Sequence, residues 1–285
     1  MAERDGYPAG VPCWIDTSQT DPDAAAAFYS GLFGWELEDL MPPGSGAKYL
    51  VGRIRGGQVA AISSAAEGDP GSPTWNTYIW VESADESARK VAEAGGTVLL
   101  EPFDVFDAGR MAVCADREGA VFSLWEARQH RGARVVNEAG ALNFNGLETR
   151  DVGEAAAFYG AVFGWRPFDL PAGKAWALPG YGDHLEKLTP GIRARTAEFG
   201  VPGFEDVVAT INPIGDDQPD ARPRWTVTFS TDDADATAAR AADLGGEVVL
   251  GPFDGPFVRL AVIRDPQGAT FTASQFVPEN ANHGS

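Results

Sequence analysis

The sequence predicts an α+β fold built from four βαβββ modules, and two observations carry that prediction. The chain repeats itself: AAFYSGLFGW at 26–35 recurs as AAFYGAVFGW at 156–165, and WNTYIWVESAD from Trp75 matches WTVTFSTDDAD from Trp225. Within each copy, a strand followed by a capped helix occurs twice, and short apolar strands separated by Gly and Pro follow each helix.

The spacing of the repeat divides the chain. Phe28 corresponds to Phe158, 130 positions later, whereas Trp75 corresponds to Trp225, 150 positions later. The second copy therefore contains an insertion of about 20 residues, which we place near 181–205. We expect one domain at 1–130 and a second at 139–285, joined by a polar linker from Arg128 to Glu138.

The first module begins with VPCWIDT, which alternates as a strand does. The helix that follows has Asp21 as its expected N-cap, Pro22 in its first turn and Gly34 at its end. KYLVGRIRGGQVAAIS then supplies the remaining strands.

The second module repeats this plan. WNTYIWVES is an expected strand, and the helix in DESARKVAEAGG is expected to begin near Asp85 and to end at Gly95-Gly96. GRMAVCADREGAVFSLWE supplies the last strands. In the insertion, helical stretches are expected at 183–188 and 192–199, separated by Pro190-Gly191.

Composition limits the partners. A formal net charge of −19 disfavours binding to nucleic acids and anionic membranes, because phosphate binding requires clustered Lys and Arg. It favours small molecules, cationic ones above all, unless the acidic excess serves only solubility. No segment reads as a signal peptide or a membrane span, so a cytoplasmic location is expected, with a monomer or homodimer as the assembly. Cys13 and Cys114 lack the spacing of zinc or redox sites and are expected to be buried.

A resemblance follows from FYxxxFGW, GGxVxxxPFD and the closing DxxGAxFxxW and DPQGATF motifs. With these motifs the chain, from about residue 10 to 276, resembles the vicinal oxygen chelate superfamily of glyoxalase I, extradiol dioxygenases and bleomycin-resistance proteins. It looks especially similar to a tandem actinobacterial subgroup often labelled antigen or hydroxylase. The resemblance implies two cup-shaped mixed sheets, each made by two modules, with the helices on the outer faces.

The resemblance also implies where metal ligands would lie. Metal-dependent members carry His or Glu at three matching strand positions of each cup. Here those positions hold Trp14, Tyr78 and Ser123 in the first cup, and Phe144, Thr228 and Thr272 in the second. None supplies an imidazole or a carboxylate, so both cups are expected to be free of metal and cofactor. His130, His184 and His283 fall outside the matching positions.

Strand alternation assigns side chains to the cups. The first cup is expected to be rich in aromatic residues, and the second smaller and more polar. Asn143 and Asn145 fit this register badly, because it places them on the helix side. The candidate ligand-binding residues are Trp14, Asp16, Asn76, Tyr78, Trp80 and Ser123 in the first cup, and Phe144, Thr228, Ser230 and Thr272 in the second, with His184 from the insertion. No catalytic residue is assigned.

These residues leave two interpretations open. Trp14, Tyr78 and Trp80 either stack a flat ligand, with Asp16 pairing a cation, or fill the cup as core. The insertion is either a lid, from which His184, Glu186 and Phe204 reach the ligand, or a dimer contact or surface cover. Each PFD loop, with Phe106 or Phe257 after it, is either a pocket rim or an ordinary turn.

The leading hypothesis is a metal-free protein that sequesters a planar aromatic natural product or antibiotic, which a net negative charge would favour if it is cationic. The alternative is a metal-independent enzyme, such as an isomerase, cyclase or hydroxylase-like protein, that uses Asp16 or Tyr78 as acid or base on an aromatic metabolite. A third hypothesis is a structural or surface-interaction protein with filled cups.

Overall fold

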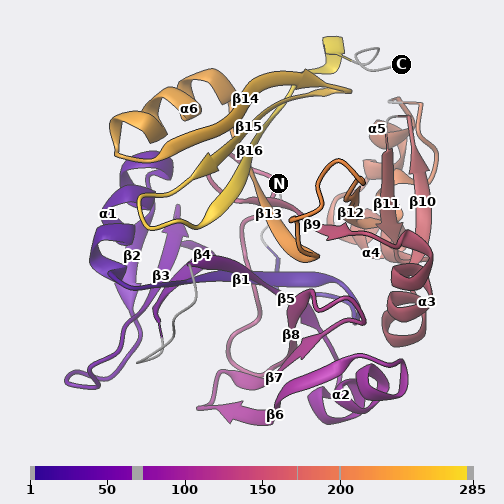
Figure 1. Ribbon diagram of the computed structural model, residues 1–285, viewed down its shortest axis with the longest axis horizontal. Coiled ribbons are helices and arrows are strands. Elements are labelled where there is room, and N and C mark those ends of the chain that lie inside the picture. The colour runs from indigo at the N-terminus through magenta and orange to yellow at the C-terminus, as the bar shows by residue number, and fades with distance from the viewer. Residues whose placement is uncertain (1–3, 66–72, 172, 199, 281–285) are drawn as a thin grey trace.

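Two eight-stranded mixed sheets form the framework of the computed structural model, which describes residues 4–65, 73–171, 173–198 and 200–280 (Figure 1). Sheet A has the order β2-β3-β4-β1-β5-β8-β7-β6 and sheet B the order β10-β11-β12-β9-β13-β16-β15-β14. Sheet A contains β1 (Pro12–Gln19), β2 (Glu36–Asp39), β3 (Tyr49–Ile54), β4 (Gly57–Ser64), β5 (Thr74–Trp80), β6 (Thr97–Val105), β7 (Gly109–Ala115) and β8 (Val121–Ala127). Sheet B contains β9 (Leu142–Thr149), β10 (Arg166–Leu170), β11 (Gly173–Ala177), β12 (Val207–Pro213), β13 (Arg224–Ser230), β14 (Glu247–Gly255), β15 (Val258–Arg264) and β16 (Thr270–Phe276).

Each set of four strands carries one long helix, which confirms the four βαβββ modules. The helices are α1 (Pro22–Phe33), α2 (Ala84–Glu93), α3 (Val152–Phe163) and α6 (Ala234–Asp243). Asp21 caps α1 as expected, since its carboxylate accepts from the Ala24 amide at 3.0 Å. Helix α2 begins next to Asp85 as expected, and its cap is Ser83, whose hydroxyl accepts from the Glu86 amide at 3.2 Å. Asp85 lies in the first turn and pairs with Arg110.

The two halves of the chain interlock through their helix-bearing faces. Helix α1 contacts α6, α2 contacts α3, and β5 contacts β13 between the sheets (Figure 1). Both hydrophobic cores draw on both halves: one joins Val91 to Phe158, and the other joins Phe28 to Phe271. Burial of apolar surface therefore stabilises both the contact between the halves and the fold of each half.

The repeated FY and closing DxxG motifs meet across this interface. The Tyr29 hydroxyl donates to Asp265 at 2.9 Å, and the Tyr159 hydroxyl donates to Asp116 at the same distance. Each tyrosine comes from one half and its aspartate from the other. The motif that identifies the repeat thus acts as a reciprocal link between its copies.

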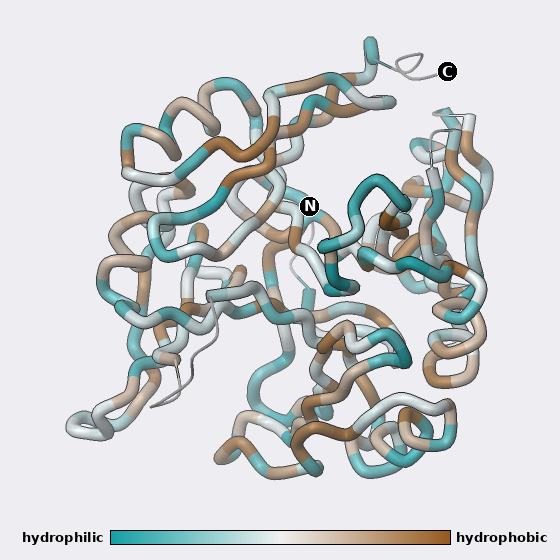
Figure 2. The backbone as a smooth tube through the Cα atoms, viewed as in Figure 1, coloured by the Kyte–Doolittle hydropathy of each residue, from teal (hydrophilic) through white to brown (hydrophobic). Residues whose placement is uncertain are grey.

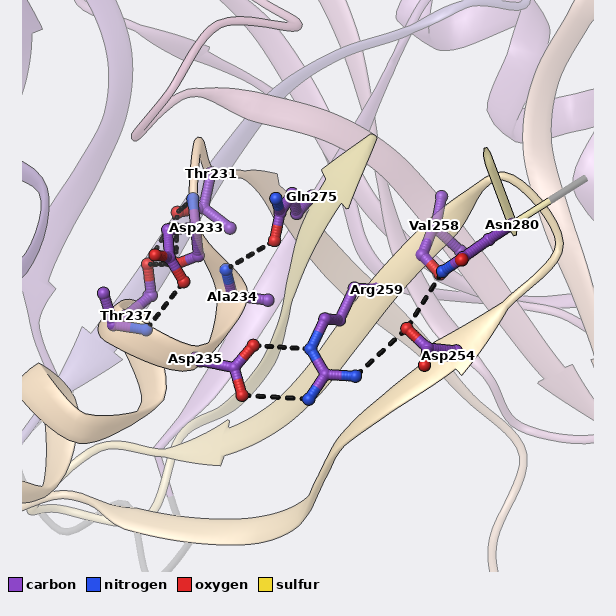
Figure 3. Close-up of polar contacts among 11 residues, drawn as sticks. Thr231, Asp233, Ala234, Asp235, Thr237, Asp254, Val258, Arg259, Gln275 and Asn280 are labelled. Atoms are coloured by element: carbon purple, nitrogen blue, oxygen red, sulfur yellow. Dashed lines mark hydrogen bonds and ion pairs between the residues drawn. The ribbon is translucent and has the colours of Figure 1, made fainter. Parts of the chain in front are cut away.

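The PFD motif also has a structural role. Asp254 of this motif accepts from Arg259 at 3.0 Å, and the same guanidinium binds both carboxylate oxygens of Asp235 in the first turn of α6 (Figure 3). Arg110 links Asp104 to Asp85 in the first half in the same way. Phe106 and Phe257 follow in tight turns with positive φ values of 47° and 61°.

The insertion forms α4 (Tyr181–Leu188), α5 (Ile192–Glu198) and a 3-10 turn, η1 (Phe204–Asp206); a second 3-10 turn, η2 (Pro278–Asn280), follows β16. The helical stretches are those expected, although Phe199 lies outside the described residues, as do His283 and the chain ends. The segment 128–138 is more than a polar linker, because Ala133 and Val135 are buried and three backbone amides of this segment bind Cys13 and Gln58 carbonyls. None of the described helices is long and apolar enough to cross a membrane.

Candidate functional site

The helix-free face of each sheet is built from rows of side chains that the strand register brings side by side. In sheet A, one row runs Leu100, Val113, Ser123, Tyr78, Trp14 across five neighbouring strands. In sheet B, the equivalent row runs Leu250, Val262, Thr272, Thr228, Phe144. Directly paired residues share a face, so these rows define the first cup and the second cup.

The predicted site residues of each cup are therefore neighbours. Trp80 pairs with Trp125 and Asp16 with Asn76 in the first cup, and Ser230 pairs with Ser274 in the second. The doubtful assignment of Asn145 is confirmed, whereas Asn143 lies at a register shift between β9 and β13, where its side-chain amide donates to Asn137 at 3.3 Å. Asn145 does lie on the helix side, where it is buried and its Oδ1 accepts from the Thr77 hydroxyl at 2.8 Å.

The first cup is filled. Trp14 is 1% exposed and Tyr78 is 8% exposed, and Ser123 and Trp125 are buried as well. The imidazole of His130, from the segment between the halves, packs edge-on against Trp14 with ring centroids 4.4 Å apart. Burial lowers the pKa of His130 to about 4, so the ring is neutral at pH 7.

Asp16 forms the polar centre of the first cup. Its carboxylate accepts from Tyr78 at 2.7 Å, from Asn76 at 2.9 Å and from Tyr49 at 3.2 Å. Burial raises the pKa of Asp16, and the three hydrogen bonds oppose this only in part. Within the described residues its partners are all neutral donors, so the carboxyl group is held by hydrogen bonds and not by an ion pair. Trp14 completes the cluster, since its indole N–H donates to Tyr49 at 3.0 Å.

The second cup has a different surface. Phe144, Thr228 and Thr272 are all partly exposed, as is Ser230. Hydroxyl groups from β13 and β16 form its floor. Beside them lies an apolar wall from β14 and β15, consisting of Leu250, Phe253, Leu260 and Val262. Figure 2 shows hydrophobic residues along these two strands, and Leu250 is 57% exposed.

At the centre of the second cup, Gly146 stands where the first cup has Asp16. A Cβ at this position would lie 2.6 Å from the Thr210 hydroxyl and 2.8 Å from both Asn212 Nδ2 and the Thr226 hydroxyl. The glycine thus brings three polar side chains together without a carboxylate. The two cups share the same strand pairing, but the first has a carboxylate at its centre and the second has hydroxyl and amide groups there.

A pocket of about 140 Å³ lies at the rim of the second cup. The N-terminal segment contributes Arg4 and Tyr7, the insertion contributes Tyr181 and Phe204, and β9 contributes Phe144. Phe204 packs edge-on against Phe144 with centroids 6.3 Å apart. Of the insertion residues expected to reach a ligand, Phe204 lines this pocket.

The other two do not line this pocket. His184 lies on α4, stacked on Tyr181 with centroids 6.2 Å apart, and burial lowers its pKa, with a smaller contribution from Arg4. Glu186 accepts from the backbone amides of Gly191 and Arg193, so its carboxylate caps the start of α5.

The side chains at the metal-ligand positions do not fit a metal ion. The register places Trp14, Tyr78 and Ser123 side by side, and Phe144, Thr228 and Thr272 likewise, as a shared ligand set requires. They nevertheless offer only indole, phenol, phenyl and hydroxyl groups, whereas transition metals require imidazole, thiolate or carboxylate donors. The described residues contain no group of three or more His, Cys, Asp or Glu arranged to hold a metal ion.

Sequence reasoning missed several features of these faces. Tyr49 joins the first cup from β3, two strands away from β1, and His130 joins it from the connecting segment. Arg4 joins the rim of the second cup. The apolar wall was missed because cross-strand pairing of β14 with β15, which includes two register shifts, decides which side chains face the cup. A local signal was present in the apolar residues that β6 and β14 carry at matching positions, Leu100 and Phe103 in the first half and Leu250 and Phe253 in the second.

Comparison with known proteins agrees with this architecture. The family model of the Glyoxalase/Bleomycin resistance protein/Dioxygenase superfamily matches residues 15–124, and that of the glyoxalase-like domain matches residues 144–274. The glyoxylase-like protein CFP32 of Mycobacterium tuberculosis is 39% identical over 98% of this chain and 100% of its own length. The anthracycline biosynthesis protein DauV of Streptomyces sp. (strain C5) is 35% identical over 93% of each chain.

Solved structures share the fold at low sequence identity. The Mn(II)-bound glyoxalase from Novosphingobium aromaticivorans has a TM-score of 0.60 at 16% identity, over 94% of this chain and 83% of its own. A variant of 4-hydroxymandelate synthase from Streptomyces coelicolor has a TM-score of 0.57 at 12% identity, over 94% and 93%.

Proposed function

The chain belongs to the glyoxalase/bleomycin resistance protein/dioxygenase superfamily, and from that premise we propose that it binds a planar aromatic small molecule in its second cup without a metal ion. The observation that carries the proposal is the contrast between the cups. Both cups have an exposed apolar wall, with Leu100 in the first and Leu250 in the second, but the first cup is filled by its own rings, whereas the second has a partly exposed hydroxyl floor beside that wall. Such a combination binds the face of a flat ring system and the polar groups at its edge.

The relatives support the class of ligand. Two proteins that match over 93% of this chain, DauV and DnrV, are named as anthracycline biosynthesis proteins, and anthracyclines are planar fused-ring compounds. A net charge of −19 favours a ligand that carries an amino sugar over its uncharged aglycone. Binding of this kind sequesters a natural product or antibiotic and requires no chemical step.

The two cups offer a matched pair of variants for the test. Leu250 on β14 and Leu100 on β6 occupy equivalent rows and are 57% and 54% exposed, so replacing either by Asp should cost little stability. We expect Leu250→Asp to weaken binding of an anthracycline aglycone about tenfold, which corresponds to about 1.4 kcal/mol, because it places a charge against the apolar ring. Leu100→Asp should leave the affinity unchanged.

Ligand fluorescence anisotropy measures the affinity, and thermal unfolding checks that both variants are folded. A second variant, Thr228→Tyr, places in the second cup the ring that Tyr78 supplies in the first, and should block binding. If Leu100→Asp weakens binding and Leu250→Asp does not, the ligand lies in the first cup. Equal affinities in all variants would place it in neither cup.

Asp16 supports a second candidate function, a metal-independent enzyme. A carboxyl group whose pKa is raised by burial, beside the phenols of Tyr78 and Tyr49, is suited to move a proton in a dry site. Turnover of an aromatic polyketide by chelator-treated protein, lost in Asp16→Asn while the fold is retained, would favour this function. Binding without turnover would favour the first.

A further inference from the structure

The guanidinium of Arg4 is a half-buried cation at the rim pocket. The segment that carries it is fixed by backbone and side chain: the Arg4 amide donates to the Arg134 carbonyl at 2.9 Å, and the Tyr7 hydroxyl donates to the Ala133 carbonyl at 2.6 Å. The guanidinium carbon lies 5.0 Å from the centre of the Tyr7 ring. The position of the charge is thus set by the fold and not by a free side chain.

The guanidinium of Arg4 carries more N–H donors than its described partners use. Of its five N–H groups, one donates from Nη1 to the Tyr181 hydroxyl at 2.7 Å, and the group also interacts with the Tyr7 hydroxyl. Tyr181 accepts this bond, so its own O–H hydrogen remains available to a further acceptor. Both side chains line the pocket, which therefore contains a cation and a hydroxyl donor side by side.

Acidic side chains do not neutralise this cation within the described part of the chain. Glu205, which also lines the pocket, is bound by Arg193 at 2.7 Å and by the Thr196 hydroxyl at 3.2 Å. Arg259, by contrast, is held by two carboxylates. In a chain with 41 acidic residues, a half-buried arginine whose described side-chain partners are phenols can pair with an anion.

The rest of the pocket limits what can carry that anion. Phe144 and Phe204 provide aromatic surface, Val208 aliphatic surface, and Asn143 an amide. A volume of about 140 Å³ is well below the roughly 300 to 1,000 Å³ of pockets for drug-sized ligands. The space matches one ring with a single acidic group and is small for a fused polycycle.

We propose that this rim pocket binds a small aromatic carboxylate, whose two oxygens accept from the guanidinium of Arg4 and the hydroxyl of Tyr181. An arginine is suited to this role because its permanent charge and fixed planar N–H groups make a directed, charge-assisted hydrogen bond to a carboxylate oxygen. The proposal does not rest on the proposed function, because Arg4 and Tyr181 come from the N-terminal segment and the insertion, whereas the aromatic site uses the hydroxyl floor and the apolar wall of the second cup. Phe144 borders both.

The test uses benzoate and its neutral isostere benzamide with the full-length protein. Isothermal titration calorimetry should show saturable binding of benzoate with a Kd below about 10 mM. Arg4→Gln should weaken it at least tenfold, and Arg4→Lys, which keeps the charge but loses the planar fork, should weaken it about threefold. Benzamide should bind more weakly than benzoate and equally to all three proteins.

Arg131→Gln is the matched control. Arg131 is also stacked on a ring, 5.7 Å from the centre of Trp80, but it does not line the pocket, so this variant should bind benzoate as the wild type does. Absence of saturable benzoate binding to the wild type, or equal affinity in wild type and Arg4→Gln, would overturn the proposal.

The same variants separate this proposal from the proposed function. The anthracycline aglycone should bind Arg4→Gln and wild type equally. Loss of benzoate binding in Arg4→Gln with no aglycone binding to any protein would support the carboxylate site and reject the aromatic site. Aglycone binding to all proteins, with benzoate affinity unchanged in Arg4→Gln, would reject the carboxylate site alone.

Discussion

Removing the hydroxyl of Tyr29 tests the link between the two halves. The residue is fully buried, and its ring stacks on Trp35 with centroids 5.4 Å apart, so Tyr29→Phe keeps the packing. What disappears is a hydroxyl that donates to Asp265 at 2.9 Å and accepts from the Trp75 indole N–H at 3.2 Å. The substitution therefore isolates two hydrogen bonds at the centre of the interface.

The magnitude follows from these two bonds. A hydrogen bond to a charged group contributes about 1.5 to 3 kcal/mol, and leaving a buried N–H unpaired costs about 1 to 3 kcal/mol. Asp265 keeps a hydrogen bond from Gln19 at 2.8 Å and three backbone amides, which limits the loss. We expect the free energy of unfolding to fall by about 3 kcal/mol.

The duplication supplies an internal replicate. Tyr159 donates to Asp116 at 2.9 Å and accepts from Trp225 at 3.1 Å, and Asp116 keeps only two described backbone amides as donors, so Tyr159→Phe should cost at least as much as Tyr29→Phe. Urea unfolding followed by fluorescence and circular dichroism gives both values, and coincident curves justify the comparison. A loss below about 1 kcal/mol in either variant would refute the assignment of these bonds as principal links.

Three further expectations concern the cups. Because burial lowers the pKa of His130 to about 4, protonation favours the unfolded chain, so stability should fall by up to about 3 kcal/mol as pH drops from about 6.5 to 4. His130→Phe should remove that part of the slope in urea titrations across this range, and an unchanged slope would contradict the burial of the ring. Gly146→Ala should lower the free energy of unfolding by about 1 to 2 kcal/mol, because its Cβ would lie 2.6 Å from the Thr210 hydroxyl. An unchanged midpoint in thermal unfolding would show that the surrounding side chains rearrange without cost. Elemental analysis of purified protein should find less than about one tenth of an equivalent of transition metal. A stoichiometric, chelator-resistant metal would contradict the inference that the side chains at the metal-ligand positions cannot hold a metal ion.

The sequence predicted what depends on local pattern. The repeat located the modules, Asp21 located a helix start, and alternation placed Trp14 in a cup and Asn145 on the opposite face. Asn145 looked misplaced only because its partner is Thr77, on the other sheet. A polar residue on a core face is explained once the residue opposite it is known.

The exposure of each cup could not be predicted in this way. The filling of the first cup includes His130, which reaches Trp14 from the segment between the halves. The path of such a connecting segment cannot be predicted from hydrophobic periodicity in the sequence. The pocket beside Arg4 has the same origin, since it forms where the N-terminal segment meets the insertion. Both features are contacts between segments distant in sequence.

The interlocking of the halves resembles a twofold-symmetric dimer whose subunits have been joined into one chain. In a dimer of identical subunits, every substitution appears twice, at symmetry-related places. Here one cup can hold Asp16 while its counterpart holds Gly146, and the shared cores still keep the two faces together. The covalent connection also fixes the effective concentration of one half for the other, so assembly of the framework does not depend on how dilute the protein is.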